Sequence, residues 1–226
     1  MLAGAEGRHA AVVRRLRVSE PVDLVDGRGG RAACTVAAVG RDTVTCQVVS
    51  RRTDAPPSPR IVLVQALAKG DRGELAVELA TEVGVDEIIP WQAARSVVRW
   101  DGERERKALE RWRSTAREAA KQSRRSRLPG IVDPVTTTAL AARLAAGPAR
   151  ALVLHESAGD LLSRADLPGD GDIVLVVGPE GGVTEGELDV LRSAGACVVR
   201  LGPTVLRTST AGAVAIAVVS TRIGRW

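Results

Sequence analysis

Two glycine-rich turns contain the residue types in this sequence that are best suited to hold a ligand. The first, Gly178-Pro-Glu-Gly-Gly182, follows the apolar run Ile173–Val177 directly, and the second is Leu201-Gly-Pro-Thr-Val-Leu-Arg207. Glycine lets the backbone approach a ligand closely, and ligands of open α/β sheets bind at the carboxyl ends of the strands. Each turn alone is also typical of a structural loop, but two at consecutive strand ends can wall a single pocket.

The pattern around these turns excludes the common phosphate-binding loops. Neither turn has the G-x-G-x-x-G spacing of a dinucleotide site or the G-K-[ST] of a Walker loop. Thr184 and Glu187 have the T-x-x-E spacing of a capping box, which predicts that a helix begins just after the first turn.

Positive charge is concentrated in one segment of the chain. From Arg95 to Arg127, twelve Arg and Lys stand against five Asp and Glu, a surplus of +7 where the whole sequence has +5. Arginine contacts to phosphate provide affinity for nucleic acid that does not depend on base sequence. The segment therefore predicts an RNA-binding face, and the alternative of a solvated helix surface stays open.

Aromatic residues are scarce, since the sequence has four Trp and no Phe or Tyr. Trp91, Trp100 and Trp112 fall in or beside the basic segment and could stack on a splayed base. Burial in a core or in a dimer interface is the favoured interpretation.

The remaining composition argues against several other classes of protein. Three Cys form no C-x-x-C pair and only two His are present, which disfavours disulfide scaffolds and metal sites. The sequence has no run of about 18 apolar residues and no apolar leader. We therefore expect a soluble cytoplasmic protein with no metal and no membrane partner.

The chain divides at residues 54–60, where three prolines in a short polar stretch disfavour both helix and central strand. We expect residues 1–53 to form a small β-barrel, residues 54–60 a linker and residues 61–226 an α/β domain with a mostly parallel sheet. The expected strands of the first part are Pro21–Val25, Ala32–Val39 and Thr43–Ser50. The expected elements of the second part are strands at Ile61–Leu67, Glu87–Trp91, Ala151–His155, Ile173–Val177 and Cys197–Leu201, and helices at Arg72–Val83, Arg104–Gln122, Thr137–Ala146, Glu185–Ala194 and from Thr208.

Seven ordered motifs between Arg14 and Ala211 give the chain a family resemblance. They are Gln65-Ala-Leu-Ala-Lys69, Glu82-Val-Gly-Val85, Arg95-Ser96-Val97, Arg111-Trp112, Glu118-Ala-Ala-Lys-Gln122 and the two glycine turns. In this order the sequence resembles the RsmE family of the SPOUT superfamily. The family methylates N3 of a uridine in 16S ribosomal RNA, uridine 1498, with S-adenosylmethionine as donor.

The resemblance implies an α/β SPOUT methyltransferase domain with a C-terminal trefoil knot, preceded by a small PUA-like β-barrel. It also implies that the protein forms a homodimer and that it binds the 16S RNA of the small ribosomal subunit. The matching positions imply a cofactor site of Leu154, His155, Val177, Gly178, Pro179, Gly181, Gly182, Leu201, Gly202, Val205, Leu206 and Thr208. They imply RNA contacts at Arg14, Lys69, Arg95, Arg117, Lys121, Gln122, Arg124 and Arg125.

Catalysis at uracil N3 requires loss of a proton and stabilisation of the negative charge that develops on the base. Arg207, beside the second turn, and Arg95 are the candidates for stabilising that charge. Glu180, within the first turn, is a candidate catalytic carboxylate, and capping of the next helix or holding of the loop is its alternative role.

Two departures from the family pattern leave alternatives open. Family members begin with an extra Phe-rich strand, so the barrel here is expected to lack its first strand or the true start to lie upstream. Ser209 stands where the family has Glu in R-x-E-T-A. A SPOUT enzyme acting on another rRNA site or on tRNA, or a non-catalytic RNA-binding homologue, therefore stays possible.

Overall fold

The computed structural model describes residues 1–147 and 149–226 and separates into two compact units. The first unit comprises Met1–Pro56 together with Arg125–Arg127, and the second comprises Pro57–Arg124 together with Leu128–Trp226. A short segment that follows the long basic helix in sequence is therefore part of the N-terminal unit. No helix in the described ranges is both long and apolar enough to cross a membrane.

The N-terminal unit is a three-stranded antiparallel sheet in the order β1-β2-β3. Its strands are β1 (Pro21–Val25), β2 (Gly30–Val39) and β3 (Val44–Thr53), which confirms the three predicted strands. Two short helical segments that the sequence did not predict, α1 (Gly4–Arg8) and η1 (His9–Val13), precede the sheet. Ala10 of η1 and Leu16 form a small core with Val36 and Val44, so a helical turn, and not additional strands, covers the sheet.

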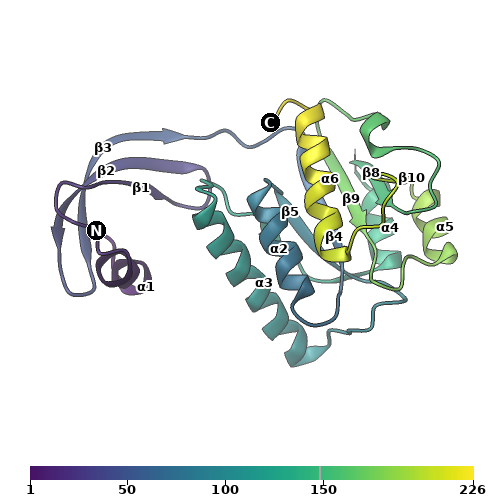
Figure 1. The fold of residues 1–226 in the computed structure, drawn as a ribbon, viewed down its shortest axis with the longest axis horizontal. Coiled ribbons are helices and arrows are strands. Elements are labelled where there is room, and N and C mark those ends of the chain that lie inside the picture. Colours follow the sequence, from purple (N-terminus) through teal and green to yellow (C-terminus); the bar gives the residue numbers. More distant parts are fainter. Residues whose placement is uncertain (148) are drawn as a thin grey trace. The chain divides into compact units, whose positions relative to one another are not determined.

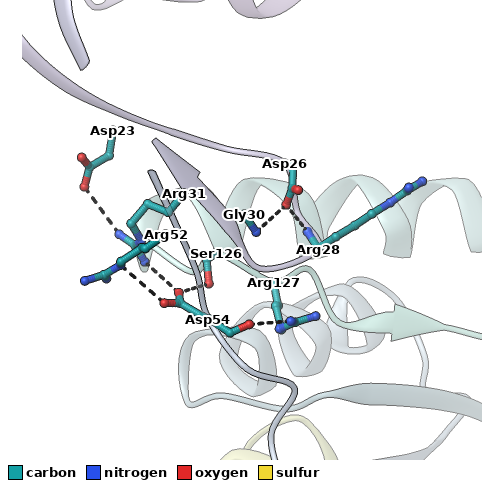
Figure 2. A network of polar contacts seen from close by, with 9 residues as sticks. All are labelled: Asp23, Asp26, Arg28, Gly30, Arg31, Arg52, Asp54, Ser126 and Arg127. Carbon is teal, nitrogen blue, oxygen red and sulfur yellow. Dashed lines mark hydrogen bonds and ion pairs between the residues drawn. The ribbon is translucent and has the colours of Figure 1, made fainter. Parts of the chain in front are cut away.

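Polar contacts within the N-terminal unit hold the segment Arg125–Arg127 to the sheet (Figure 2). The Ser126 hydroxyl donates to Asp54 Oδ2 at 2.5 Å, and Arg127 Nη2 donates to the Asp54 carbonyl oxygen at 2.6 Å. Arg31 and Arg52 lie within 3.8 Å of the same carboxylate. The hydrogen bond from Ser126, together with these arginines, lowers the pKa of Asp54. Asp54 therefore links the end of β3 to a segment more than 70 residues later in the chain.

The second unit is a parallel sheet in the order β10-β8-β9-β4-β5-β6, with β7 also paired to β5. Figure 1 labels β10, β8, β9, β4 and β5 of this sheet. Its strands are β4 (Arg60–Ala66), β5 (Glu87–Gln92), β6 (Gly130–Ile131), β7 (Val135–Thr136), β8 (Ala149–Leu154), β9 (Asp172–Val177) and β10 (Cys197–Val199). From Ile61 to Ala66, every residue of β4 is at most 1% exposed. A continuous buried run of this kind is expected of a parallel strand covered on both faces.

Helices cover both faces of this sheet (Figure 1). They are α2 (Arg72–Glu82), α3 (Gly102–Gln122), α4 (Thr137–Ala145), α5 (Glu185–Ser193) and α6 (Thr208–Arg222), with a short 3₁₀ turn η2 (Leu162–Arg164). Residues of α2, α3 and α6 share one hydrophobic cluster with the sheet, and residues of α4 and α5 share the other. The mixed α/β fold predicted from the sequence is therefore confirmed.

The tryptophans of the basic segment belong to this core. Trp91 and Trp112 are 0% and 1% exposed, and Trp100 packs edge-on against Trp112 with ring centroids 5.0 Å apart. Trp112 also packs on Gly73 of α2, where an added Cβ would lie 3.0 Å from its ring. The core interpretation is thus confirmed for Trp91 and Trp112, and base stacking by these two is wrong because their rings are buried.

Candidate functional site

A cavity of about 570 Å³ lies in the second unit where β8 and β9 end. Both glycine turns contribute to its wall, because β9 ends at Val177 and β10 ends shortly before Leu201. Among its lining residues are all the positions proposed for the cofactor, namely Leu154, His155, Val177, Gly178, Pro179, Gly181, Gly182, Leu201, Gly202, Val205, Leu206 and Thr208. Segments that are remote in the sequence therefore meet at one edge of the sheet.

The first turn has a backbone that only glycine accommodates at two positions. A Cβ on Gly178 would lie 2.7 Å from Val183 Cγ2, which is closer than real side-chain atoms approach. Gly182 has φ +75°, in the left-handed region, and its amide donates to the Pro179 carbonyl oxygen at 2.9 Å. The glycines of this turn are thus required by close packing and by backbone geometry.

The capping box predicted after this turn is present at the start of α5. Thr184 accepts a hydrogen bond from the Glu187 amide, and Glu187 Oε2 accepts one from the Thr184 amide at 3.1 Å. The Glu187 carboxylate is only 6% exposed and also accepts hydrogen bonds from the Ala94 amide and the Thr137 hydroxyl. Burial by itself raises the pKa of Glu187, but these hydrogen bonds outweigh it and lower the pKa. Glu187 therefore links α5 to the loop that precedes Arg95.

Glu180 holds the first turn to the loop that follows β4. Its Oε1 accepts a hydrogen bond from Arg72 Nη1 at 2.9 Å and one from the Lys69 amide at 3.3 Å. Burial opposes ionisation, but these hydrogen bonds and the charge of Arg72 lower the pKa of Glu180. A carboxylate with a lowered pKa is a weak base, and capping of α5 is done by Thr184 and Glu187. Of the roles considered for Glu180, the contacts match the holding of the loop.

Two arginines considered for catalysis lie on the cavity wall. Arg95 Nη1 donates to the Gly181 carbonyl oxygen at 2.9 Å. Arg207 is exposed at the N-cap position of α6 and has extended backbone geometry. The sequence separates these two arginines by more than 100 positions, and the fold brings both to the same cavity.

Several lining residues were not among the individual site residues predicted from the sequence. They are Arg72, Glu156, Val183, Arg200, Thr204 and Ala211. Arg200 directly precedes the second turn, so its position next to that motif was the signal available. Its Nε is buried and has no hydrogen-bond partner among the described residues. Including Arg200, the wall contains four Arg and two Glu, which makes the cavity formally cationic.

The proposed RNA-binding residues are distributed over both units. Arg95 lines the cavity, and Lys69 lies in the loop that Glu180 holds. Arg117, Lys121 and Gln122 are exposed on α3, and Arg124 follows this helix with φ +56°. Arg14 and Arg125 belong to the N-terminal unit.

The cavity suits a small ligand with one flat apolar part. Its volume falls within the roughly 300–1,000 Å³ typical of small-molecule sites. Val205 is 78% exposed and Leu206 36%, so the second turn presents aliphatic side chains that a ring could cover. The glycines of both turns expose backbone donors and acceptors. These aliphatic side chains and backbone groups fit S-adenosylmethionine, which combines an adenine ring with an aminoacyl end. In the described part of the chain, no cluster of three or more His, Cys, Asp or Glu could hold a metal ion.

Two family models match the chain. The model of the RNA methyltransferase domain matches residues 56–220, and the model of the RNA methyltransferase PUA domain matches residues 2–49. Together these matches extend over most of the sequence and over the cavity.

Named relatives are similar over nearly the full length. The Ribosomal RNA small subunit methyltransferase E of Mycobacterium bovis is 49% identical over 227 residues, which cover 99% of this chain and 86% of that protein. The Bacillus subtilis protein of the same name is 32% identical over 226 residues, which cover 97% of this chain and 88% of that protein. A crystal structure of the Neisseria gonorrhoeae protein of this name, bound to S-adenosyl methionine, has a TM-score of 0.83 at 29% identity and covers 95% of this chain and 88% of that one.

Proposed function

Because the chain belongs to the ribosomal RNA small subunit methyltransferase E family, we propose that it methylates N3 of a uridine in 16S ribosomal RNA. S-adenosylmethionine serves as the methyl donor, as in the family and in the ligand-bound relative. The observation that carries the proposal is the cavity at the strand ends, where both glycine turns meet two arginines.

The chain would hold the cofactor mainly through backbone groups and aliphatic side chains. We assign the adenine to Val177, Val205 and Leu206, and we assign backbone contacts to Gly178, Gly181, Gly182 and Gly202. When bound, S-adenosylmethionine supplies an electrophilic methyl group. The remaining chemistry falls to the side chains of this protein.

Arg207 and Arg95 would stabilise the negative charge that develops on the uracil oxygen as N3 loses its proton. Arg207 is the better placed of the two for contact with the base, because it is exposed and Arg95 already donates to Gly181. Glu180 would act as a positioning residue for the first turn, since Arg72 holds it as a carboxylate.

The proposed RNA contacts and the proposed homodimer are based on the family and on exposed side chains. We propose that residues 1–53 and the arginines of α3 contact the RNA, with residues 54–60 as linker and residues 61–226 as the methyltransferase domain. We also propose the family's trefoil knot, a cytoplasmic location and a homodimer. The packed pair α2 and α6 supports the homodimer, because Leu75 and Val214 are each 41% exposed there.

The test is transfer of labelled methyl groups from S-adenosylmethionine to small ribosomal subunits that lack the modification, with the nucleoside identified by mass spectrometry. We expect 3-methyluridine in 16S RNA, and Arg207→Ala should slow the transfer by about 100-fold. Arg192→Ala on α5 is the control, because Arg192 pairs only with residues of its own helix in the described contacts. Labelled tRNA or a different labelled nucleoside would indicate another SPOUT activity, and binding without transfer would indicate a non-catalytic homologue.

A further inference from the structure

One polar side chain is buried in the centre of the parallel sheet. Gln65 of β4 is 0% exposed, and two positions before it in the same strand is Leu63, which is also 0% exposed and has the same side-chain direction. Gln65 is not among the residues that line the cavity. Its burial in an aliphatic surrounding calls for a physical reason.

The hydrogen bonds of Gln65 lead to the first glycine turn. Its Nε2 donates to Thr208 Oγ1 at 2.9 Å, and Thr208 Oγ1 donates to the Gly178 carbonyl oxygen at 2.8 Å. Thr208 is itself only 7% exposed at the start of α6. Gln65 and Thr208, which are 143 positions apart, thus form a buried series of hydrogen bonds that ends at Gly178 on the cavity wall.

The donor and acceptor roles in this series of hydrogen bonds follow from the groups involved. Gln65 Nε2 also lies 3.2 Å from the Ala66 carbonyl oxygen, which only accepts, so the amide nitrogen must be on that side. The Thr208 hydroxyl has a single proton, and because Gln65 donates to its oxygen, that proton is free to point toward Gly178. A residue that could only accept at position 65 would draw the proton the other way.

The contact with Gly178 orients a whole peptide unit. Pro179 has no N–H, so the carbonyl oxygen is the sole hydrogen-bonding group of the Gly178–Pro179 peptide. On its other side Gly178 packs against Val183. The bond from Thr208 therefore fixes the plane in which the chain leaves β9 and enters the turn.

Gln65 combines two hydrogen bonds from its amide nitrogen with an unpartnered amide oxygen. Gln65 Oε1 is buried without a hydrogen-bond partner among the described residues, an arrangement that costs free energy. An apolar side chain of similar length would avoid that cost. Such a side chain would also lack the hydrogen bond that the Gln65 amide donates to Thr208.

We propose that Gln65 is a positioning residue for the cofactor site, which acts through Thr208 to orient the carbonyl of Gly178. The proposal rests on the proposed function, in that S-adenosylmethionine is the ligand of the cavity. It adds a residue that lies outside the cavity and has no part in the turns that the sequence singled out.

The experiment is a double-mutant cycle on binding of S-adenosylmethionine, measured by calorimetry with the full chain. We expect Gln65→Met and Thr208→Val each to raise Kd by about tenfold, and the double variant to bind no more weakly than Thr208→Val alone. Thr81→Val is the matched control, since it removes another buried hydroxyl bond, from Thr81 to the Val77 carbonyl oxygen, away from the cavity.

Thermal unfolding separates positioning from a structural role. Gln65→Met should keep or raise the Tm, because it removes the unpartnered Oε1. Additive effects on Kd in the double variant, or an unchanged Kd in Gln65→Met, would overturn the proposal. A general loss of stability that accounts for the weaker binding would also overturn it.

A second readout needs no ligand and separates this proposal from the proposed function. The Gly182 amide, which donates to Pro179, should exchange its hydrogen faster in Gln65→Met and in Thr208→Val, and equally fast in the double variant. If the wild type fails to bind S-adenosylmethionine, the proposed function is wrong, and this exchange still decides whether Gln65 orders the turn. Equal exchange rates in all variants would refute the inference.

Discussion

Arg95 donates to the carbonyl oxygen of Gly181 at 2.9 Å, and its own Cβ lies 3.1 Å from where a Cβ on residue 181 would be. The two residues are 86 positions apart, and their contact joins the loop after β5 to the first glycine turn. The glycine and the arginine therefore depend on each other: the close approach needs the absent side chain, and the hydrogen bond needs the close approach.

Gly181→Ala should weaken cofactor binding because the new methyl group would push Arg95 away from the turn. A displacement of a few tenths of an ångström at this contact is expected to lower affinity for S-adenosylmethionine by about tenfold, which corresponds to ~1.4 kcal/mol. Calorimetric titration measures this effect. Gly186→Ala on α5 is the control, since nothing lies within 4 Å of the Cβ it would add. Equal affinities of the two variants would contradict the prediction.

Trp112→Ala should destabilise the second unit and should not act through RNA contact. The ring of Trp112, on α3, is 1% exposed and packs against Gly73 of α2 and against Trp100. Its removal leaves a cavity expected to cost about 3–5 kcal/mol. Denaturant unfolding gives the free energy of unfolding. Trp226→Ala, at a side chain that is 64% exposed, should leave it unchanged. The idea fails if Trp112→Ala is as stable as the wild type.

Glu187→Gln should remove part of the acid sensitivity of folding. The folded-state pKa of Glu187 is lowered, so its carboxylate contributes stability that is present above the ordinary pKa of about 4.3 and is lost as the pH falls through the folded-state value. We expect the substitution to reduce stability at pH 7 by about 2 kcal/mol and by less in acid, because the protonated wild type also lacks the charge.

Urea unfolding at pH 7 and in the acid range tests this dependence. Glu185→Gln is the control, since that side chain is 79% exposed at the start of the same helix. A loss of stability in Glu187→Gln that is equally large in acid would show that the charge of Glu187 is not its cause.

Arg124→Ala and Arg125→Ala should weaken RNA binding and flatten its dependence on salt. Each arginine that contacts a phosphate contributes about one unit to the slope of log K against log salt concentration. Affinity for S-adenosylmethionine should stay unchanged, because neither residue lines the cavity. Filter binding to 16S RNA at several salt concentrations gives the slopes, and an unaltered slope removes the residue from the RNA interface.

Local patterns in the sequence were sufficient to predict most helices and strands. The buried run of β4, the capping box of Thr184 and Glu187, and the change from β-prone runs to α/β alternation each depend on neighbouring residues. The helical segments at Gly4–Val13 were not predicted, because their stability comes from contacts such as that of Ala10 with Val44. The cavity residues were anticipated from motif positions in the resemblance, and their roles stay predictions.

The sequence by itself determined most of the helices and strands, the two glycine turns and the family, because these depend on residue types at short or fixed spacing. Only the tertiary structure decided that Arg95 meets Gly181, that Gln65 reaches Gly178 through Thr208, and that Arg125–Arg127 joins the N-terminal unit. Such contacts depend on strand order and helix packing, which bring together residues that are remote in sequence. No local pattern contains that information, since the same motifs would fit several strand orders until the buried core selects one.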